Sequence, residues 1–164
     1  MITSARVRLR RTLLRIGGVG ADFIDDPCLQ VIAGDGVPFA TTELRVIRGK
    51  PNECHRNAVL LWLNGKCAAI ATGYYLGPDD VWRQHSWGMT NAGTIVDTHS
   101  GGRQYFGVPM KSLDAVKFAE DRCAPKSACR FRRWVWDSYS VNADRRRLQP
   151  LVEALLSADV TPNK

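Results

Sequence analysis

Long apolar runs are missing from this sequence. The longest, around Ala58–Leu63, falls well short of the roughly 20 residues that a membrane-spanning helix needs, so we expect no membrane span. Internal repeats and low-complexity tracts are also absent, and no linker marks a second domain. With 164 residues, 45% of them hydrophobic, the chain is predicted to fold as one domain, residues 1–164, around a core of its own.

Cysteine pairing motifs are absent as well. The chain has 5 cysteines, an odd number, and no Cys-x-x-Cys pair. That count does not suit a complete disulfide framework, and the spacing of Cys123 and Cys129 is too wide for a zinc knuckle. We therefore expect a reducing, cytoplasmic location, at least one free thiol, and neither a metal nor another cofactor.

Acidic residues are missing before Asp22, whereas arginines cluster there and again near the C-terminus. The net charge is +7 and the pI is about 9.5. The clusters consist of Arg6, Arg8, Arg10, Arg11, Arg15, Arg130, Arg132, Arg133, Arg145, Arg146 and Arg147. Such clusters favour an acidic partner or nucleic acid, although a solvated basic surface explains them equally simply.

Residues 1–20 combine this charge with helical spacing. The apolar residues Leu9, Leu13 and Ile16 recur at i, i+4 and i+7. Ser4 suits an N-cap, and Gly17-Gly18 suits a helix end. The spacing predicts a basic helix over about Ser4–Ile16. An arginine-rich, acid-free start is also typical of organellar transit segments, but we favour the ordered helix.

The remaining elements are predicted from turn residues and apolar patterns. The segment Asp25–Pro38 is predicted to be loop, with a short strand at Leu29–Ala33. Thr42–Ile47 suits either a strand or a turn of helix. Further elements are expected over Cys54–Leu63 (helix), Lys66–Leu76 (strand), Val81–Met89 and Thr94–Thr98 (hairpin), Leu113–Ala119 (helix), Phe131–Trp136 (strand) and 143–157 (helix). The predicted class is α+β, with a central, cysteine-bearing helix packed on an antiparallel sheet.

The region 51–100 carries the candidate chemistry. Cys54 would begin a helix, where the helix dipole favours a thiolate and free backbone N–H groups can bind an oxyanion. His85 would lie mid-strand and Asp97 on the returning strand. A thiol, an imidazole and a carboxylate in this order suit a cysteine nucleophile activated by an oriented base.

The hairpin register decides which side chain faces His85. A turn with an even residue count centred on Asn91-Ala92 sets Thr98 opposite His85. A bulge at Gly93 changes the register by one residue. Asp97 and His99 share a face, so either suits the role of the third group.

Three short motifs follow one another in this region: Gly73-Tyr74, His85-Ser86-Trp87 and Val96-Asp97-Thr98. In their order and spacing they resemble the transglutaminase-like branch of papain-like cysteine enzymes. In that family a cysteine-headed helix precedes a Gly-Tyr strand, a His-x-Trp strand and Val-Asp-Pro-Thr. The resemblance covers Asn52–Ser100, about a third of the chain. This chain departs from the family pattern in having Thr98 for the proline and His55 beside the cysteine.

The resemblance implies a papain-like core and a cysteine hydrolase or acyltransferase acting on the amide or acyl bonds of a protein, peptide or other substrate. Cys54 would be the nucleophile, His85 the general base and acid, and Asp97 the orienting carboxylate. Weaker candidates for the oxyanion hole or the substrate cleft are Asn52, Asn57 and Trp87. The acceptor, water or an amine, stays open, with hydrolysis the simpler expectation for a chain this short.

Other interpretations compete with the enzyme. Arg130-Phe131-Arg132-Arg133-Trp134 alternates charge and rings, as in proteins that bind single-stranded nucleic acid. A non-catalytic interaction protein on the same fold is another alternative. A zinc site made of Cys54, His55, His85 and His99 would lack the usual ligand spacing.

Overall fold

A computed structural model describes residues 4–24, 26–99, 101–110, 114, 115 and 118. The strand and helix predicted at Phe131–Trp136 and 143–157 lie outside the described residues. Of the helix predicted at Leu113–Ala119, residues 114, 115 and 118 are described, and they are helical. No helix in the described part of the chain has the length and apolar character needed to cross a bilayer.

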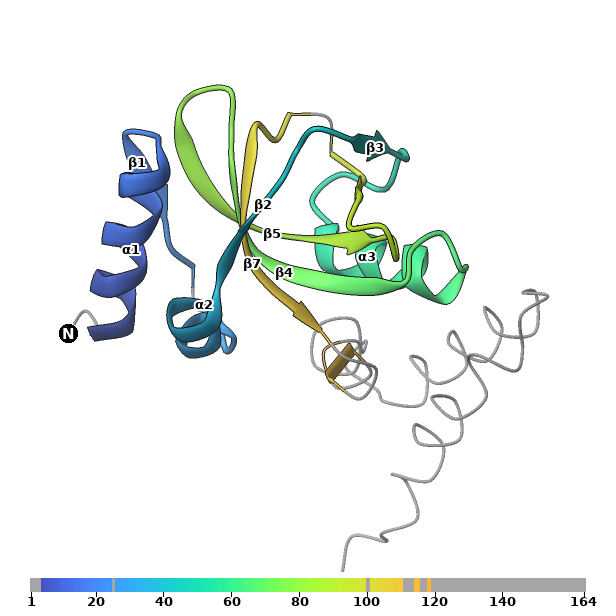
Figure 1. The fold of residues 1–164 in the computed structure, drawn as a ribbon, viewed down its shortest axis with the longest axis horizontal. Helices are drawn as coiled ribbons and strands as arrows, with labels where there is room; N and C mark the ends of the chain where they lie inside the picture. The colour runs from blue at the N-terminus through green and yellow to red at the C-terminus, as the bar shows by residue number, and fades with distance from the viewer. Residues whose placement is uncertain (1–3, 25, 100, 111–113, 116–117, 119–164) are drawn as a thin grey trace, which may run out of the picture.

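In the described part of the chain, helices α1, α2 and α3 lie against one face of a mixed sheet (Figure 1). The elements are α1 (Ser4–Ile16), β1 (Gly20–Asp22), α2 (Leu29–Asp35), β2 (Val37–Phe39), β3 (Leu44–Val46), α3 (Cys54–Leu63), β4 (Ala69–Leu76), β5 (Val81–Met89), β6 (Ile95–Asp97) and β7 (Gln104–Met110). The strand order is β2-β7-β4-β5-β6-β3, and β1 pairs with the start of β5. The β1–β5 and β3–β6 pairs are parallel and the others antiparallel, which confirms the α+β class.

Alternate residues of β4 divide the core between two faces of the sheet. Tyr74 and Leu76 pack against α1 and α2, whereas Ile70, on the same face, packs against α3. Figure 1 accordingly shows α1 and α2 gathered at one end of the sheet and α3 at the other. The opposite face buries Ala71 against Trp87 and Tyr105. The sheet is therefore buried on both faces around the middle of β4 and β5.

The two predicted helices that flank the sheet form with the predicted bounds. In α1, Leu9 and Leu13 are fully buried, while the arginines occupy the outer face. Gly18, with φ of 82°, turns the chain after α1. In α3, every residue from Leu61 to Leu63 is buried, and Gly65, with φ of 65°, follows its end.

The strand predicted at Leu29–Ala33 is wrong, because these residues begin α2. A carboxylate oxygen of Asp26 accepts a hydrogen bond from the backbone N–H of Cys28 at 2.8 Å, which favours a helical turn there. Leu29 and Ile32 then fall on one side and are buried against the layer of α1. The helical spacing of Leu29 and Ile32 thus decides the structure of this segment, although its glycines are typical of loops.

Strand β7 was not predicted as a strand, because Gly107 and Pro109 interrupt its sequence. The glycine is required by close packing. Gly107 pairs with Gly73 on β4, and a Cβ on Gly73 would lie 2.1 Å from the carbonyl oxygen of Phe106. Pro109 is exposed near the end of the strand. Together these residues let β4 and β7 approach closely and bring Tyr105 beside the hairpin β5–β6.

Candidate active site

Cys54 is the first residue of α3, and it is half-buried where this helix begins against β5. The helix opens with a hydrogen bond from the backbone N–H of Asn57 to the carbonyl oxygen of Glu53, at 2.8 Å. Backbone N–H groups in the first turn of a helix have no acceptor within the helix. The sulfur therefore lies at the positive end of the α3 dipole, beside donors suited to an anion.

The sulfur of Cys54 also lies at a gap in the pairing of β5. On this edge β1 pairs with Val81–Arg83 and β6 pairs with Gly88 and Met89, so residues 84–87 have no strand beside them. Within this gap, the backbone N–H of Ser86 donates a hydrogen bond to the sulfur. The sulfur of Cys54 thus accepts the hydrogen bond that a carbonyl oxygen of a neighbouring strand accepts along the paired parts of β5.

The imidazole of His85 reaches the same sulfur from the other face of β5. Only 4% of His85 is exposed. Its Nε2 lies 2.8 Å from Oδ1 and 2.9 Å from Oδ2 of Asp97, and a side-chain hydrogen bond joins the ring to Cys54. Because Nε2 faces the carboxylate, Nδ1 is the nitrogen left to face the sulfur.

Asp97 is fully buried and accepts several hydrogen bonds besides those to His85. The hydroxyl of Tyr105 donates to Oδ2 at 2.6 Å. The backbone N–H groups of Thr98 and His99 donate to Oδ1 at 2.6 and 3.1 Å. A buried carboxylate with this many donors is stabilised in its charged form and held in one orientation.

The turn between β5 and β6 sets the register that brings Asp97 to His85. Gly93 has φ of 85°, and the ladder pairs Gly88 with Val96 and Met89 with Ile95. Of the two predicted registers, this is the one shifted by a bulge at Gly93. Continued along β5, it sets Asp97 opposite Trp87, and so diagonal to His85 on the same face.

Burial and pairing act in opposite directions on the three pKa values. Burial raises the pKa of the Cys54 thiol, but His85 and two backbone N–H groups bring it below its ordinary value of 9.0. Burial lowers the pKa of His85, but Asp97 and Cys54 raise it to about 9. Burial raises the pKa of Asp97, but its hydrogen bonds with His85 and Tyr105 hold it below 3.8. These directions favour a thiolate, an imidazolium and a carboxylate in one row at neutral pH.

His99, the alternative third group, lies near His85 without taking the place of Asp97. The two imidazole centroids are 6.2 Å apart, and the His99 side chain is exposed. The ring of Tyr75 contacts both, with centroid distances of 4.9 Å to His85 and 5.2 Å to His99. Asp97, and not His99, therefore contacts Nε2 of His85, while Tyr75 and His99 lie on its outer side.

The indole of Trp87 stacks on His85, with the ring centroids 6.3 Å apart and the planes at 21°. It is fully buried, and Tyr105 and Phe39 pack against its edges. Its Nε1 has no hydrogen-bond partner among the described residues. Trp87 therefore packs against His85 within the core, and its predicted role in the oxyanion hole stays a prediction.

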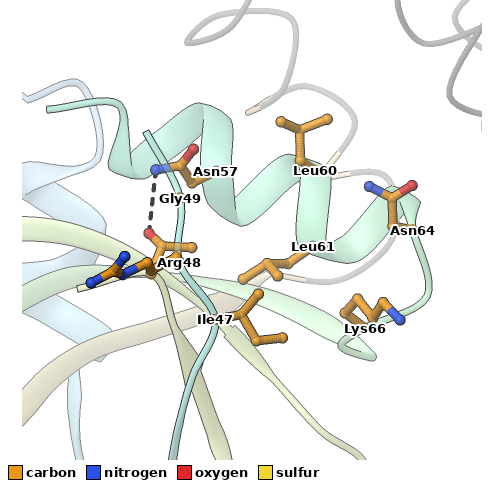
Figure 2. A pocket seen from close by; sticks show the side chains of 9 residues that line it. Ile47, Arg48, Gly49, Asn57, Leu60, Leu61, Asn64 and Lys66 are labelled. Carbon is orange, nitrogen blue, oxygen red and sulfur yellow. Dashed lines mark hydrogen bonds between the residues drawn. The ribbon is translucent and has the colours of Figure 1, made fainter. Parts of the chain in front are cut away.

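Asn57 holds the chain that precedes α3. Its Nδ2 donates to the carbonyl oxygen of Lys50 at 2.8 Å and to Oγ1 of Thr98 at 3.3 Å, the bond dashed in Figure 2. Its Oδ1 accepts from the backbone N–H of Lys50 at 3.2 Å. Both amide ends are occupied and only 5% of the residue is exposed, so Asn57 has a structural role here, and its predicted role at the substrate cleft stays a prediction.

Asn52, the remaining predicted site residue, lies two positions before Cys54 on an exposed turn. Its φ of 59° is left-handed, a conformation that asparagine tolerates better than most residues. Within the described residues its side chain makes no hydrogen bond that ties it to the sulfur, so its predicted role as an oxyanion donor stays a prediction.

A pocket of about 340 Å³ lies between α3 and the chain after β3 (Figure 2). Its walls include Ile47, Leu60, Leu61 and Lys66, and Asn57 borders it. Cys54, His85 and Asp97 do not line it. The reactive row and this pocket are thus lined by different residues.

Sequence reasoning missed several residues that complete the site. Tyr105 comes from β7, and the Ser86 N–H depends on the gap between β1 and β6. His55 bonds Ser86 through its side chain. The hydroxyl of Ser86 was visible in the sequence as a polar atom on a predicted strand, whereas Tyr105 gave no such signal because β7 was not predicted.

No protein-family model, curated protein or solved structure matches this chain. The chemistry of the site therefore has to follow from its own geometry. In the described part of the chain, no three His, Cys, Asp or Glu side chains are arranged to hold a metal ion. The zinc site considered from Cys54, His55, His85 and His99 is accordingly not formed there.

Proposed function

We propose that this chain is a thiol hydrolase or acyltransferase of the papain-like, transglutaminase-like type, acting on an amide or acyl bond. The observation that carries the proposal is the hydrogen-bonded row of Cys54, His85 and Asp97 at the start of α3. A cysteine-bearing helix packed on a largely antiparallel sheet supports the same assignment. A sulfur kept only as a packing group would not need a buried imidazole and carboxylate beside it.

In the first half-reaction, the thiolate of Cys54 attacks the carbonyl carbon of the substrate. The carbonyl electron pair moves to the oxygen, and the N–H groups at the start of α3 stabilise the resulting oxyanion. As the carbon–nitrogen bond breaks, His85 donates its Nδ1 proton to the leaving amine. The products of this step are a thioester on Cys54 and a neutral His85.

In the second half-reaction, neutral His85 takes a proton from the acceptor as it attacks the thioester. Water yields a carboxylic acid, whereas an amine yields a new amide. Either reaction returns the thiolate and the imidazolium. Asp97 keeps its charge throughout and holds the ring with Nδ1 toward the sulfur.

Selective alkylation tests the nucleophile. Limiting iodoacetamide at pH 6–7, followed by peptide mass spectrometry, is expected to label Cys54 well before Cys28, Cys67, Cys123 and Cys129. His85→Ala removes the side chain that does most to lower the pKa of Cys54 against the effect of burial, so the preference for Cys54 is expected to disappear. Equal labelling of all cysteines in the native protein would overturn the proposal and favour a non-catalytic interaction protein.

Acylation tests turnover beyond thiol reactivity. An activated ester such as p-nitrophenyl acetate is expected to release a burst of nitrophenol with one acetyl group on Cys54. Decay of the acetyl group in water alone indicates a hydrolase, and faster decay on adding a primary amine indicates a transferase. Cys54→Ser serves as the control, and a burst that persists in it would place the acylated group elsewhere.

A second candidate function, nucleic-acid binding, rests on the outer face of α1. Arg8, Arg11 and Arg15 border a shallow hollow of about 510 Å³ together with Ser4 and Thr12. Among the described residues, no carboxylate forms an ion pair with these arginines. Unpaired guanidinium groups along one stripe suit a row of phosphates.

Salt-dependent binding tests this second function. A fluorescent oligonucleotide is expected to bind at about 50 mM salt and to be released steeply toward about 200 mM. Replacing Arg8, Arg11 and Arg15 by Gln is expected to lower the salt slope while leaving Cys54 alkylation unchanged. Absence of binding at low salt would exclude this function for the chain.

A further inference from the structure

His55, the residue after Cys54, is part of a second hydrogen-bonded row that does not include His85. Its Nδ1 lies 2.8 Å from Oγ of Ser86, and that hydroxyl donates to Oγ1 of Thr72 at 2.9 Å. Ser86 is 1% exposed and Thr72 is fully buried. These two hydrogen bonds therefore link α3 to β5 and β5 to β4, next to the first residue of α3.

The hydrogen bond between Ser86 and Thr72 bears on the tautomer of His55. In the arrangement where the Ser86 hydroxyl gives its only proton to Thr72, the Ser86 oxygen accepts from His55, and Nδ1 of His55 carries the proton. The outer side of the ring packs edge-on against Phe118, with the centroids 5.5 Å apart. A hydrogen bond on one side and an aromatic ring on the other thus hold this imidazole.

Ser86 forms hydrogen bonds with two consecutive residues of α3, Cys54 and His55. Its backbone N–H donates to the sulfur of Cys54, and its side chain accepts from His55. On this edge, β1 ends its pairing at Arg83 and β6 begins at Gly88. Among the strands that the structure describes, none pairs with this edge of β5 between Arg83 and Gly88. The hydrogen bond to His55 therefore fixes the position of Ser86 relative to the start of α3.

We propose that His55 is a positioning residue of the site: through Ser86 it holds the edge of β5 so that the Ser86 backbone N–H meets the sulfur of Cys54. The inference rests on the proposed thiol chemistry, because its purpose is to keep that sulfur anionic. Packing alone does not account for the row, since α1 and α2 cover the same face of the sheet with apolar side chains. A buried hydroxyl at Ser86 is stabilising only if its partners are kept.

Two substitutions at His55 separate the hydrogen bond from the packing. His55→Asn keeps an N–H donor near the position of Nδ1 and loses the ring against Phe118. His55→Leu keeps an apolar contact with Phe118 and loses the donor. Ser86→Ala removes the acceptor of His55 without touching α3, so it tests the same row if the His55 variants fold poorly.

The readout is the pH at which Cys54 alkylation is half-maximal, measured beside the denaturation midpoint of each variant. Other ionisable groups near the sulfur are unchanged in these variants: His85, Asp97, Tyr75, Glu53 and Arg56. His55→Leu and Ser86→Ala are expected to raise the alkylation midpoint by about one pH unit, the effect of weakening one hydrogen bond to a charged group. His55→Asn is expected to stay close to the native midpoint.

Each outcome decides one claim. If His55→Leu and Ser86→Ala only lower stability and leave the alkylation midpoint unchanged, His55 is structural and the inference is overturned. The same holds if His55→Asn behaves like His55→Leu, because the donor is then irrelevant. If the native protein shows no preferential labelling of Cys54, the proposed function itself fails, and the stability data on the row remain separately interpretable.

Discussion

The two ends of the helical face of the sheet are built alike but bury different chemistry. At the end covered by α1 and α2, the buried side chains of the helices are apolar, Arg6 lies over the ring of Phe23, and Trp82 Nε1 donates to the carbonyl oxygen of Gly17 at 2.7 Å. At the other end, the start of α3 adjoins the buried polar residues of the described chain, which come from both faces of the sheet. They are Asn57, Thr72, His85, Ser86 and Asp97.

Under the proposed function, this difference separates residues that serve stability from residues that serve the reaction. Apolar burial of the kind seen under α1 suffices to fix a helix on a sheet. Burying polar groups costs free energy unless every donor and acceptor finds a partner, and it adds little net stability when they do. The α3 end therefore tolerates a less favourable interior, as expected where groups are arranged for a reaction.

The largest expected effect comes from removing the charge of Asp97. In Asp97→Asn, the new amide can donate to Nε2 of His85, which forces the proton onto Nδ1 and prevents that atom from acting as a base. We expect turnover to fall on the order of a thousandfold. The matched control is Asp79→Asn, because Asp79 also pairs with a cation, Arg83, but on the surface. An equal loss of turnover in both variants would contradict a special role of the residues around the start of α3.

The second effect tests the scaffold end. Leu13→Ala on α1 is expected to lower the free energy of unfolding by about 2–5 kcal/mol, because Leu13 is fully buried. Below the melting temperature, the alkylation rate of Cys54 is expected to stay native, since α1 does not touch the site. Urea denaturation and alkylation of the same sample check both, with Val7→Ala at an exposed position as the control. A lost alkylation rate in folded Leu13→Ala would show that the two ends are coupled.

A smaller effect is expected for Tyr105→Phe, which removes one donor to a buried carboxylate. At pH 7 the loss is expected to be about 1.5–3 kcal/mol of unfolding free energy. The pKa of Asp97 is depressed in the folded protein, so its stabilisation is present above 3.8 and is lost as the pH falls through the lowered value. The difference between Tyr105→Phe and the native protein should therefore shrink in acid. A difference that stays constant down to pH 2–3 would contradict the charged hydrogen bond.

The smallest effect is a slope of stability with pH. Above pH 6.5 and the lowered pKa of Cys54, and below about 9, the folded pair holds one proton on His85 and the unfolded chain holds one on Cys54. The pair therefore leaves native stability flat in this window. Cys54→Ala removes the thiol proton from the unfolded chain, while Asp97 still holds the proton on His85. Its stability is expected to fall as the pH rises, by up to about 1.4 kcal/mol per unit. Parallel curves for both proteins would argue against the thiolate–imidazolium pair.

Local signals predicted the elements whose pattern and packing agree. The helices at Ser4–Ile16 and Cys54–Leu63 and the strand Val81–Met89 have the bounds that the sequence indicated. Strand β7 escaped because its glycine is explained only by the partner glycine on β4. Helix α2 escaped because its local signal, two apolar residues three apart, is short and stands among glycines, and only the packing against α1 stabilises it.

The candidate site was predictable in its parts and not in its arrangement. A cysteine at a helix start and a His-x-Trp strand are local features. Whether Thr98 or the face that carries both Asp97 and His99 would lie toward His85 depended on a single turn residue, Gly93. The contribution of the Ser86 N–H depended on where β1 and β6 stop pairing. Long-range register, which the sequence does not encode in any short window, therefore decided the geometry.

The hydrogen bond from the Ser86 N–H to the sulfur exists in full only while the sulfur is an anion, because a thioether or thioester sulfur is a weak acceptor. Covalent capping of Cys54 leaves the edge of β5 without its acceptor and His85 without its counter-charge. Small alkylating reagents should thus make this protein melt at a lower temperature, opposite to the effect of an ordinary bound ligand. An acylated Cys54 would lose the same hydrogen bond and the same charge pair, so the folded protein would be more stable once the acyl group has been transferred to the acceptor.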